Sequence, residues 1–288
     1  MGYRRGYRRG ISIPRPPSAP KAEPDADGTI RVEFSSASEI LGYVAGVGRS
    51  NHSVSRGCDS SFNPFTWKES VEMLKGGWPE GVKEIAFNTD KINDAIDEAS
   101  GYGIEYDTSG DYIDIGAFLE GTPECFGKVV TAEGPKETVK IVVAVTAAHY
   151  VDQELIRNRG AAICALVDQL RKTHFVSLDV VINVNGCMRH DIRTTFHLDM
   201  ENGYSRDLLA FYIANPAMLR RIWFAIVEVA TGHENCDGYG MVVEGEPVKD
   251  AINFPMIDNH NRHLWSTVES SAKQVQRMLD QVMKRQGQ

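Results

Sequence analysis

One stretch in the middle of the chain constrains the fold more than any other. It begins with VKIVVAVTAAHY, an apolar run that ends in small residues, continues with RNRGAAICALVDQLRKT, whose apolar residues have helical spacing, and closes with FVSLDVVINVNG, a second apolar run. A strand, a helix and a strand of these lengths form a right-handed crossover between parallel strands. The sequence therefore predicts an α/β protein with an open, mostly parallel sheet and flanking helices, with α+β as the alternative.

Shorter patterns predict the elements around this unit. Thr66 and Glu69 have the T-x-x-E spacing of a capping box, and Gly76-Gly77 ends the helix that follows. A second helix is expected from Pro79 to Ser100, with Asn88-Thr89 as a point where it could break. The other expected elements are a strand in TIRVEF, a helix in SSASEILGYVAG capped by Ser35 or Ser36, a strand in IRTTFHLDM, one or two helices broken near Pro216, a strand in YGMVVEG and a C-terminal helix in SSAKQVQRMLDQVMKRQ.

Charge separates the start of the chain from the rest. The pentamer GYRRG occurs twice in the first ten residues, and residues 1–21 hold six cations and no acid. Since the net charge of the whole chain is −8, the remaining residues carry −14. Arginine, glycine, tyrosine and proline without aliphatic bulk cannot bury enough surface to offset the entropy of ordering. We therefore expect a disordered basic arm over 1–28, a helical and loop-rich α+β region over 29–130 and an α/β region over 131–288.

The basic arm is the candidate nucleic-acid interface. Paired arginines neutralise phosphates, and a tyrosine every four residues can stack on unpaired bases. A body with a net charge of −14 repels a polyanion, so we do not expect the body to wrap a duplex. The arm could equally bind an acidic protein surface, including the body of another copy. The candidate binding residues are Tyr3, Arg4, Arg5, Tyr7, Arg8, Arg9 and Arg15.

Two resemblances add to this interpretation. The segment VKIVVAVTAAHYVDQELIRNRGAAICALVDQL, with VSLDVVINV after it, is similar to the first strand, helix and strand of von Willebrand factor A-like domains. FTWKESVEMLKGGWPEG, DIGAFLEGTPECF, RNRGAAICALVDQL and ANPAMLRRIWFAIVE resemble an uncharacterised family of bacteriophage and bacterial proteins, over about residues 35–245. These resemblances imply a phage-type origin and an A-domain-like fold for 131–288, and they imply no specific activity.

The A-domain resemblance also implies where a metal would bind. Such domains have D-x-S-x-S at the end of the first strand, whereas this chain has TAAHY at 146–150. A hard divalent cation needs the carboxylate and hydroxyl oxygens that are missing there, so we expect no metal site. Asp152 is the candidate for a displaced ligand.

Several other residues could hold a metal or take part in catalysis, and each has a simpler interpretation. His233 with Cys236, and His260 with His263, could form a four-ligand zinc site, but their asparagine-rich flanks favour solvent-facing loops. Five cysteines without a CxxC pair predict reduced thiols, and we expect no cofactor. Structural or solvated roles are favoured for the catalytic candidates, which are His149, Cys164, Asp179, His190, His197 and Asp199.

The aromatic residues of the body have two interpretations as well. Trp67, Trp78, Trp223 and Trp265 could stack on bases, but their apolar neighbours favour the core. Arg220-Arg221 could anchor a partner, although it lies in the apolar run MLRRIWF. Neither GxGxxG nor GxxxxGK[ST] occurs, which argues against nucleotide binding through those motifs.

These observations favour one class of function. The composition is that of a soluble globular protein, without a membrane-spanning run or a signal peptide, so we expect a cytoplasmic protein or a virion component. We expect a non-catalytic, phage-type assembly or interaction protein whose basic arm contacts single-stranded DNA or RNA. Its other expected partners are phage or host proteins and a second copy of itself, and not a membrane. The alternatives are a protein-binding adaptor or virion component without nucleic-acid binding and, less favoured, a metal-dependent enzyme.

Overall fold

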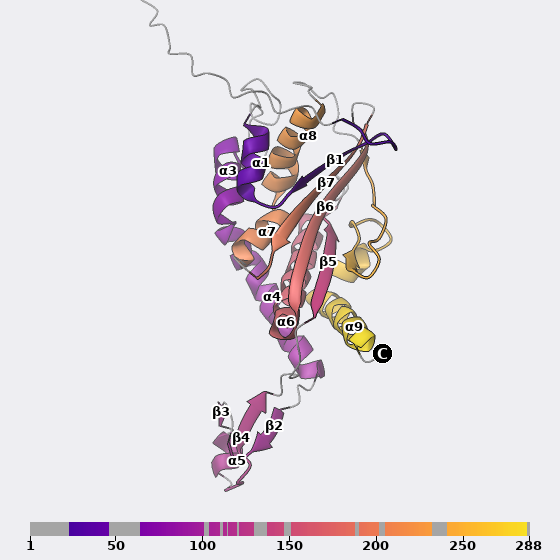
Figure 1. Ribbon diagram of the computed structural model, residues 1–288. Coiled ribbons are helices and arrows are strands. Elements are labelled where there is room, and N and C mark those ends of the chain that lie inside the picture. The colour runs from indigo at the N-terminus through magenta and orange to yellow at the C-terminus, as the bar shows by residue number, and fades with distance from the viewer. Residues whose placement is uncertain are drawn as a thin grey trace, which may run out of the picture.

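Figure 1 shows the computed structural model of the chain. It describes residues 23–45, 64–100, 104–109, 112–113, 115–119, 121–129, 137–146, 151–187, 190–201, 205–231 and 241–286. The candidate binding residues of the basic arm, Tyr3 to Arg15, lie outside these ranges.

Six strands form one mixed sheet within the described ranges. The order is β1-β7-β6-β5-β9, and β8 pairs with β6. β6, β5 and β9 are mutually parallel, β1 is parallel to β7, and β7 and β8 are antiparallel to β6. The predicted mostly parallel sheet with flanking helices is confirmed. The strands are β1 (Thr29–Phe34), β5 (Thr138–Ala144), β6 (Phe175–Cys187), β7 (His190–Asp199), β8 (Met241–Val242) and β9 (Ile252–Phe254).

The central strand-helix-strand unit forms as predicted. β5 leads through α6 (Gln153–Thr173) into β6, and the two strands pair in parallel from Thr138↔Phe175 to Ala144↔Val181. All residues from 161 to 167 of α6 are buried, because α6 packs against β6, α4, α7 and α9 at once. An amphipathic surface helix would expose part of this run, so α6 is a core helix.

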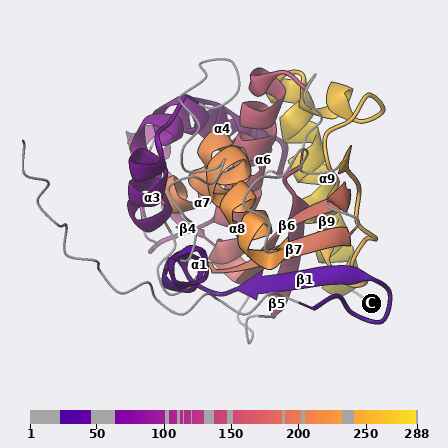
Figure 2. The ribbon, with the colours of Figure 1, turned by 90° about the horizontal axis from the view of Figure 1, so that it is seen from above.

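The other helices that pack on the main sheet lie on the same side of it as α6 (Figure 2). A break near Pro216 is confirmed, since α7 ends at Ala214 and a short π-helix, η1, precedes α8. The bounds are α1 (Ala37–Val44), α3 (Trp67–Gly76), α4 (Pro79–Ser100), α7 (Arg206–Ala214), η1 (Met218–Ile222), α8 (Trp223–Thr231), the 3₁₀-helix η2 (Arg262–Trp265) and α9 (Val268–Gln286).

The predicted helix caps are present. The Ser36 hydroxyl accepts a hydrogen bond from the Glu39 backbone N–H at 3.2 Å, which begins α1. Thr66 Oγ1 accepts from the Glu69 N–H at 3.2 Å, while the Glu69 carboxylate accepts from the Thr66 N–H at 2.7 Å. This reciprocal pair is a complete capping box for α3.

The segment after α3 differs from the sequence expectation at one point. α4 is a single helix that passes Asn88-Thr89 without a break. The Thr89 hydroxyl donates within α4 to the Ile85 carbonyl at 3.0 Å and contacts the Ala161 carbonyl of α6 at 3.4 Å, so packing on α6 accommodates this polar residue. Gly77, which ends α3, has a φ of 87°, and a Cβ there would lie 2.5 Å from Cβ of Asp207. Glycine is therefore required where α3 meets α7.

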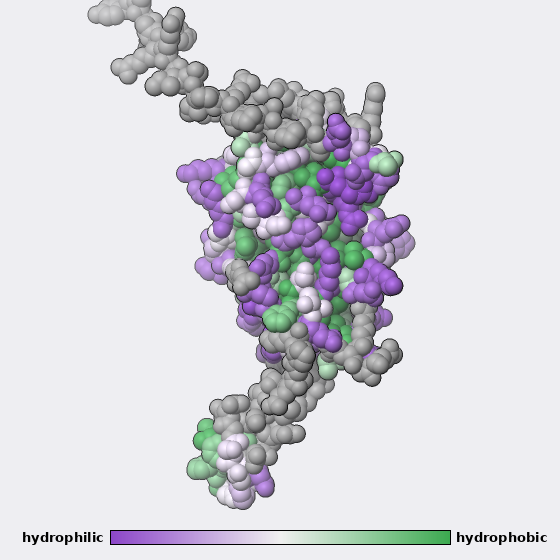
Figure 3. Space-filling view, viewed as in Figure 1, coloured by the Kyte–Doolittle hydropathy of each residue, from purple (hydrophilic) through white to green (hydrophobic). Residues whose placement is uncertain are grey.

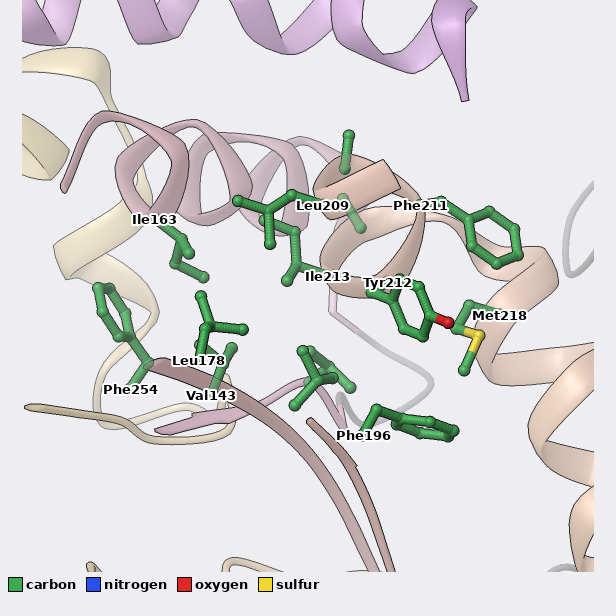
Figure 4. Packing of buried hydrophobic residues seen from close by; sticks show 14 of the residues in the cluster. Val143, Ile163, Leu178, Phe196, Leu209, Phe211, Tyr212, Ile213, Met218 and Phe254 are labelled. Atoms are coloured by element: carbon green, nitrogen blue, oxygen red, sulfur yellow. The ribbon is translucent and has the colours of Figure 1, made fainter. Parts of the chain in front are cut away.

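The core fills the space between the helices and the inner face of the sheet (Figure 4). Ile163 of α6 points down onto Val143 and Leu178 of the two central strands. Further along the sheet, Phe196 of β7 packs against Tyr212 of α7, with ring centroids 5.7 Å apart. All five side chains are buried. A smaller apolar cluster lies elsewhere and consists of Val142, Val181 and Ala251, with Val248 packed against it.

A second, smaller sheet lies beyond the end of α4, away from the main sheet (Figure 1). Within the described residues it consists of β2 (Ile104–Asp107), β4 (Phe126–Val129) and β3 (Tyr112–Ile113), all antiparallel, with the short helix α5 (Ile115–Leu119). The sequence patterns assign no individual strand or helix to these residues. Figure 3 shows hydrophobic surface at this end of the molecule, where Ile115, Phe118 and Leu119 are exposed.

The region 29–130 does not pack as a unit of its own. Its first strand, β1, pairs with β7 of the main sheet in register from Thr29↔Asp191 to Phe34↔Phe196. Its long helix, α4, contacts α6, α7 and α9. Only the small sheet lies apart from this body (Figure 1).

Candidate functional site

A cavity lies where the central parallel strands end. β5 connects through α6 to β6 on one side, while β9 lies on the other side of β5. Open α/β sheets bind ligands in crevices outside the carboxyl ends of their strands. Along the chain, α6 follows β5 and η2 follows β9. Between the start of α6 and η2 is a cavity of about 400 Å³, the strand-end crevice, lined by Asp152, Glu154, Leu155, Arg262, His263 and Ser266.

Hydrogen bonds hold the two walls of the crevice together. Asp152 caps α6, its carboxylate accepting from the Glu154 N–H at 3.0 Å. Asn158 donates through Nδ2 to the Trp265 carbonyl at 3.0 Å, and its own amide oxygen accepts from Asn88 Nδ2 at 3.0 Å. The chain of amides links α4, α6 and η2, so η2 has a defined position over the strand ends.

A fully buried arginine lies in the same part of α6. Arg159 has 0 % of its surface exposed. Its Nη1 donates to the carbonyls of Ala144 and Pro255, which lie at the ends of β5 and β9, at 3.0 Å each. Its Nε and Nη2 have no hydrogen-bond partner among the described residues. Burial lowers the pKa of Arg159 to about 10, so the side chain still carries its charge at neutral pH.

Two further buried donors around the strand ends also lack partners within the described ranges. They are the hydroxyl Oγ1 of Thr146, two residues past the end of β5, and the indole Nε1 of Trp265 in η2. The Trp265 ring packs on Phe254 of β9, with centroids 5.8 Å apart. Buried polar groups are normally hydrogen-bonded, so three such side chains from adjoining segments mark this region as unusual.

A second cavity, of about 490 Å³, lies between the strand ends and residues 244–247. Ala144 and Pro255 line it as well, so the two residues whose carbonyls hold Arg159 belong to its wall. The backbone at Gly245 lies directly on Asn183, because a Cβ at Gly245 would be 2.3 Å from Asn183 Nδ2. Glu244 lines the cavity, and its pKa is raised, first by burial and second by the charge of Asp258.

A row of charged side chains crosses four strands of the main sheet. His197 on β7 contacts Asp179 on β6, with Nδ1 and Oδ1 2.7 Å apart, and faces Glu33 on β1, with Nε2 and Oε2 3.5 Å apart. Lys140 on β5 lies 2.9 Å from the other oxygen of Asp179, whose side chain is only 9 % exposed. Cross-strand pairs of opposite charge stabilise a sheet by about 0.2–1 kcal/mol each. Both ring nitrogens of His197 face carboxylates, an arrangement that supports a structural role.

The structure brings two of the catalytic candidates together and separates others. Asp179 and His197 form the direct pair just described, whereas Asp199 accepts from the backbone N–H of Glu201 at 2.8 Å. Cys164 is 1 % exposed, and burial raises the pKa of its thiol to about 12, so it is not a reactive thiolate. His149 and the side chain of His190 lie outside the described part of the chain.

Two of the four candidate zinc ligands lie within the described part of the chain. His260 and His263 are exposed in the turn before η2 and at η2 itself, while His233 and Cys236 lie outside the described ranges. Across the residues that the structure does describe, no group of three or more histidine, cysteine or carboxylate side chains could hold a metal ion.

The aromatic and arginine candidates of the body belong to the core. Trp78, Trp223 and Trp265 are buried, and Trp67 packs against the core. Arg221 is 2 % exposed and donates through Nε to the Phe65 carbonyl at 2.7 Å.

Sequence reasoning missed Arg159, the buried arginine at the ends of β5 and β9. The signal available was the polar segment RNRG directly before AAICALV, which puts a cation next to the most apolar part of the helix. That signal cannot separate an arginine that reaches solvent from one that turns inward. The bonds to Ala144 and Pro255 span 15 and 96 residues, so only the fold reveals them.

Comparisons with other proteins place the whole body in one family. None of the described helices is both long and apolar enough to cross a membrane. No curated protein and no solved structure matched the chain. One family model matches, over residues 19–286, and it covers the main sheet, the helices and the crevice. The chain therefore belongs to the family defined by a domain of unknown function, DUF7192.

Proposed function

We propose that this chain is a non-catalytic interaction protein of phage type whose basic N-terminal arm contacts single-stranded nucleic acid in the host cytoplasm. The observation that carries the proposal is the separation of charge, with six cations and no acid in residues 1–21 against a net charge of −14 on the remainder. Paired arginines with interleaved tyrosines supply both phosphate neutralisation and base stacking.

The packing of the body supports assigning this role to the arm. Stacking on bases needs exposed aromatic rings, whereas Trp78, Trp223 and Trp265 are buried. The arginine pair in η1 is not a surface patch, because Arg221 is 2 % exposed and burial lowers the pKa of Arg220. Residues 19–286 match the family model, so most of the cations of the arm lie before the shared domain.

The test compares the full chain with a truncation that removes residues 1–22. Truncation at this point keeps Asp25 and Asp27, which pair with Arg31 at the start of the main sheet. We expect the affinity for labelled oligo(dT) and oligo(U), measured by fluorescence anisotropy at low salt, to fall at least tenfold. The slope of log affinity against log salt should also become shallower, by about 0.7 for each phosphate that the truncated chain no longer neutralises.

A charge-matched pair of variants separates binding by the arm itself from a general effect of net charge. Changing Arg4, Arg5, Arg8 and Arg9 to Gln should reproduce most of the loss. The control removes four cations from the body instead, at the exposed residues Lys68, Lys75, Lys273 and Lys284. Equal losses in the two variants would show a general effect of net charge, and unchanged affinity after truncation would place the interaction on the body; either result contradicts the arm as the binding site. A full-length chain that binds neither oligonucleotide would overturn the proposal in favour of the protein-binding alternative.

A further inference from the structure

Arg159 is a buried cation without a counter-ion among the described residues. It is 0 % exposed, it forms no ion pair with any described carboxylate, and burial is the sole cause of its lowered pKa. A charge removed from water without a partner is strongly destabilising, and buried charges in native proteins are normally paired or neutralised. The fold therefore maintains an unfavourable group at the carboxyl ends of β5 and β9.

The orientation of the guanidinium shows which of its edges is available. Nη1 is occupied by the carbonyls of Ala144 and Pro255, which fix the plane of the group against the two strands. The unpartnered atoms are Nε and Nη2. These two nitrogens form one edge of the guanidinium, on the side away from Nη1, and their N–H bonds are parallel. This is the edge that binds two oxygens of a planar anion at once.

Two further buried donors belong to residues close to the carbonyl partners of Arg159: Thr146 follows Ala144 by two residues, and the Trp265 ring packs on Phe254, next to Pro255. Thr146 Oγ1 and Trp265 Nε1 are buried and unpartnered within the described residues, and an indole nitrogen can only donate. Leu155, which lines the crevice, comes one helical turn before Arg159, so the two residues share one face of α6. The start of α6 adds the positive end of its helix dipole.

We propose that the strand-end crevice binds a small ligand through a carboxylate, which the Nε–Nη2 edge of Arg159 holds in a bidentate pair. One buried guanidinium neutralises one negative charge, so the group recognised is a monoanion. The volume of about 400 Å³ suits a metabolite-sized molecule. Arg262 at the rim adds positive charge, while Asp152 and Glu154 disfavour a highly charged anion such as a polyphosphate. Because Nε and Nη2 are buried and Arg159 is not among the residues that line the crevice, a ligand reaches that edge only when side chains at the start of α6 move aside.

The first test measures stabilisation of the full-length protein by acetate, pyruvate and inorganic phosphate, each against chloride at equal ionic strength. At about 100 times its Kd, a ligand that binds only the folded state should raise the Tm by roughly 5 °C. We expect this shift with at least one of the two carboxylates. A shift with phosphate alone would overturn the carboxylate assignment, and no shift beyond that of chloride would overturn the site.

Variants assign the effect to the guanidinium. Arg159→Met has similar length and no charge, and should remain folded because it relieves a buried charge, while its response to acetate or pyruvate should disappear. Arg159→Lys keeps the charge but cannot form the bidentate pair, and should bind at least tenfold more weakly. Arg277→Gln is the matched control: it removes an exposed arginine of α9 that does not line the crevice, and it should change the affinity less than threefold. An unchanged response in Arg159→Met would refute the proposal.

A direct measurement does not depend on any variant folding. The Nε–H of a buried arginine gives a slowly exchanging ¹H–¹⁵N resonance, and a bidentate carboxylate should shift that resonance of the wild-type protein in proportion to occupancy. If the added carboxylates that raise the Tm leave every arginine Nε resonance unmoved, the ligand lies elsewhere. Arm truncation leaves this readout intact, so the result is independent of nucleic-acid binding.

Discussion

Replacing Leu166 by Ala tests whether α6 is the central helix of the core. Leu166 is 0 % exposed and belongs to the run of buried residues from 161 to 167. The substitution removes three buried carbon atoms, which are worth about 2.4 kcal/mol at about 0.8 kcal/mol each. Because α6 packs against β6, α4, α7 and α9, the neighbouring side chains cannot relax fully into the cavity that the substitution leaves, and the remaining cavity lowers the stability further. We therefore expect the free energy of unfolding to fall by about 4 kcal/mol, within the range measured for such changes.

The matched control is Met283→Ala in α9. It removes a side chain of similar size from a helix of the same body, but Met283 is 63 % exposed, so we expect a change below about 0.5 kcal/mol. Urea unfolding followed by tryptophan fluorescence and circular dichroism gives both values, provided that the m-values agree with the wild-type protein. A difference between the two variants below about 1.5 kcal/mol would show that α6 is not packed as described.

Three smaller perturbations probe local features. Thr66→Ala should lower the free energy of unfolding by about 1 kcal/mol, whereas Thr66→Ser should not. Hydrogen bonds from Thr66 lower the pKa of Glu69. The difference in stability between wild type and Thr66→Ala, measured by urea titration, should therefore shrink as the pH falls through the folded-state pKa of Glu69. Cys164 should resist iodoacetamide in the native protein and react only after unfolding, as peptide mass spectrometry would show; native alkylation would contradict its burial. Thr194→Val deprives buried Trp223 Nε1 of its acceptor at 3.1 Å and should cost about 1–3 kcal/mol, an effect that should be absent in a Trp223→Phe background.

The sequence predicted elements whose signals lie within a few residues of one another. The capping box joins Thr66 to Glu69, three residues on, and the apolar runs of β5, α6 and β6 have lengths that leave few arrangements other than a parallel crossover. The short strand β9 and the small sheet were not predicted. β9 has only three residues and is defined by its pairing with β5, more than 100 residues earlier in the chain.

For the candidate site, too, some features could be predicted from the sequence and others depend on the tertiary structure. By itself, the sequence determined the cationic character of residues 1–21 and the crossover that carries the chain away from β5, whereas α6 begins at Gln153, four residues before the predicted helix. Only the tertiary structure decided that Asp179 and His197 would pair across β6 and β7, and that Arg159 would turn inward. The physical reason is the separation along the chain over which each effect acts. Periodicity and capping act between residues a few positions apart, whereas the burial of a charge depends on backbone carbonyls from distant parts of the chain.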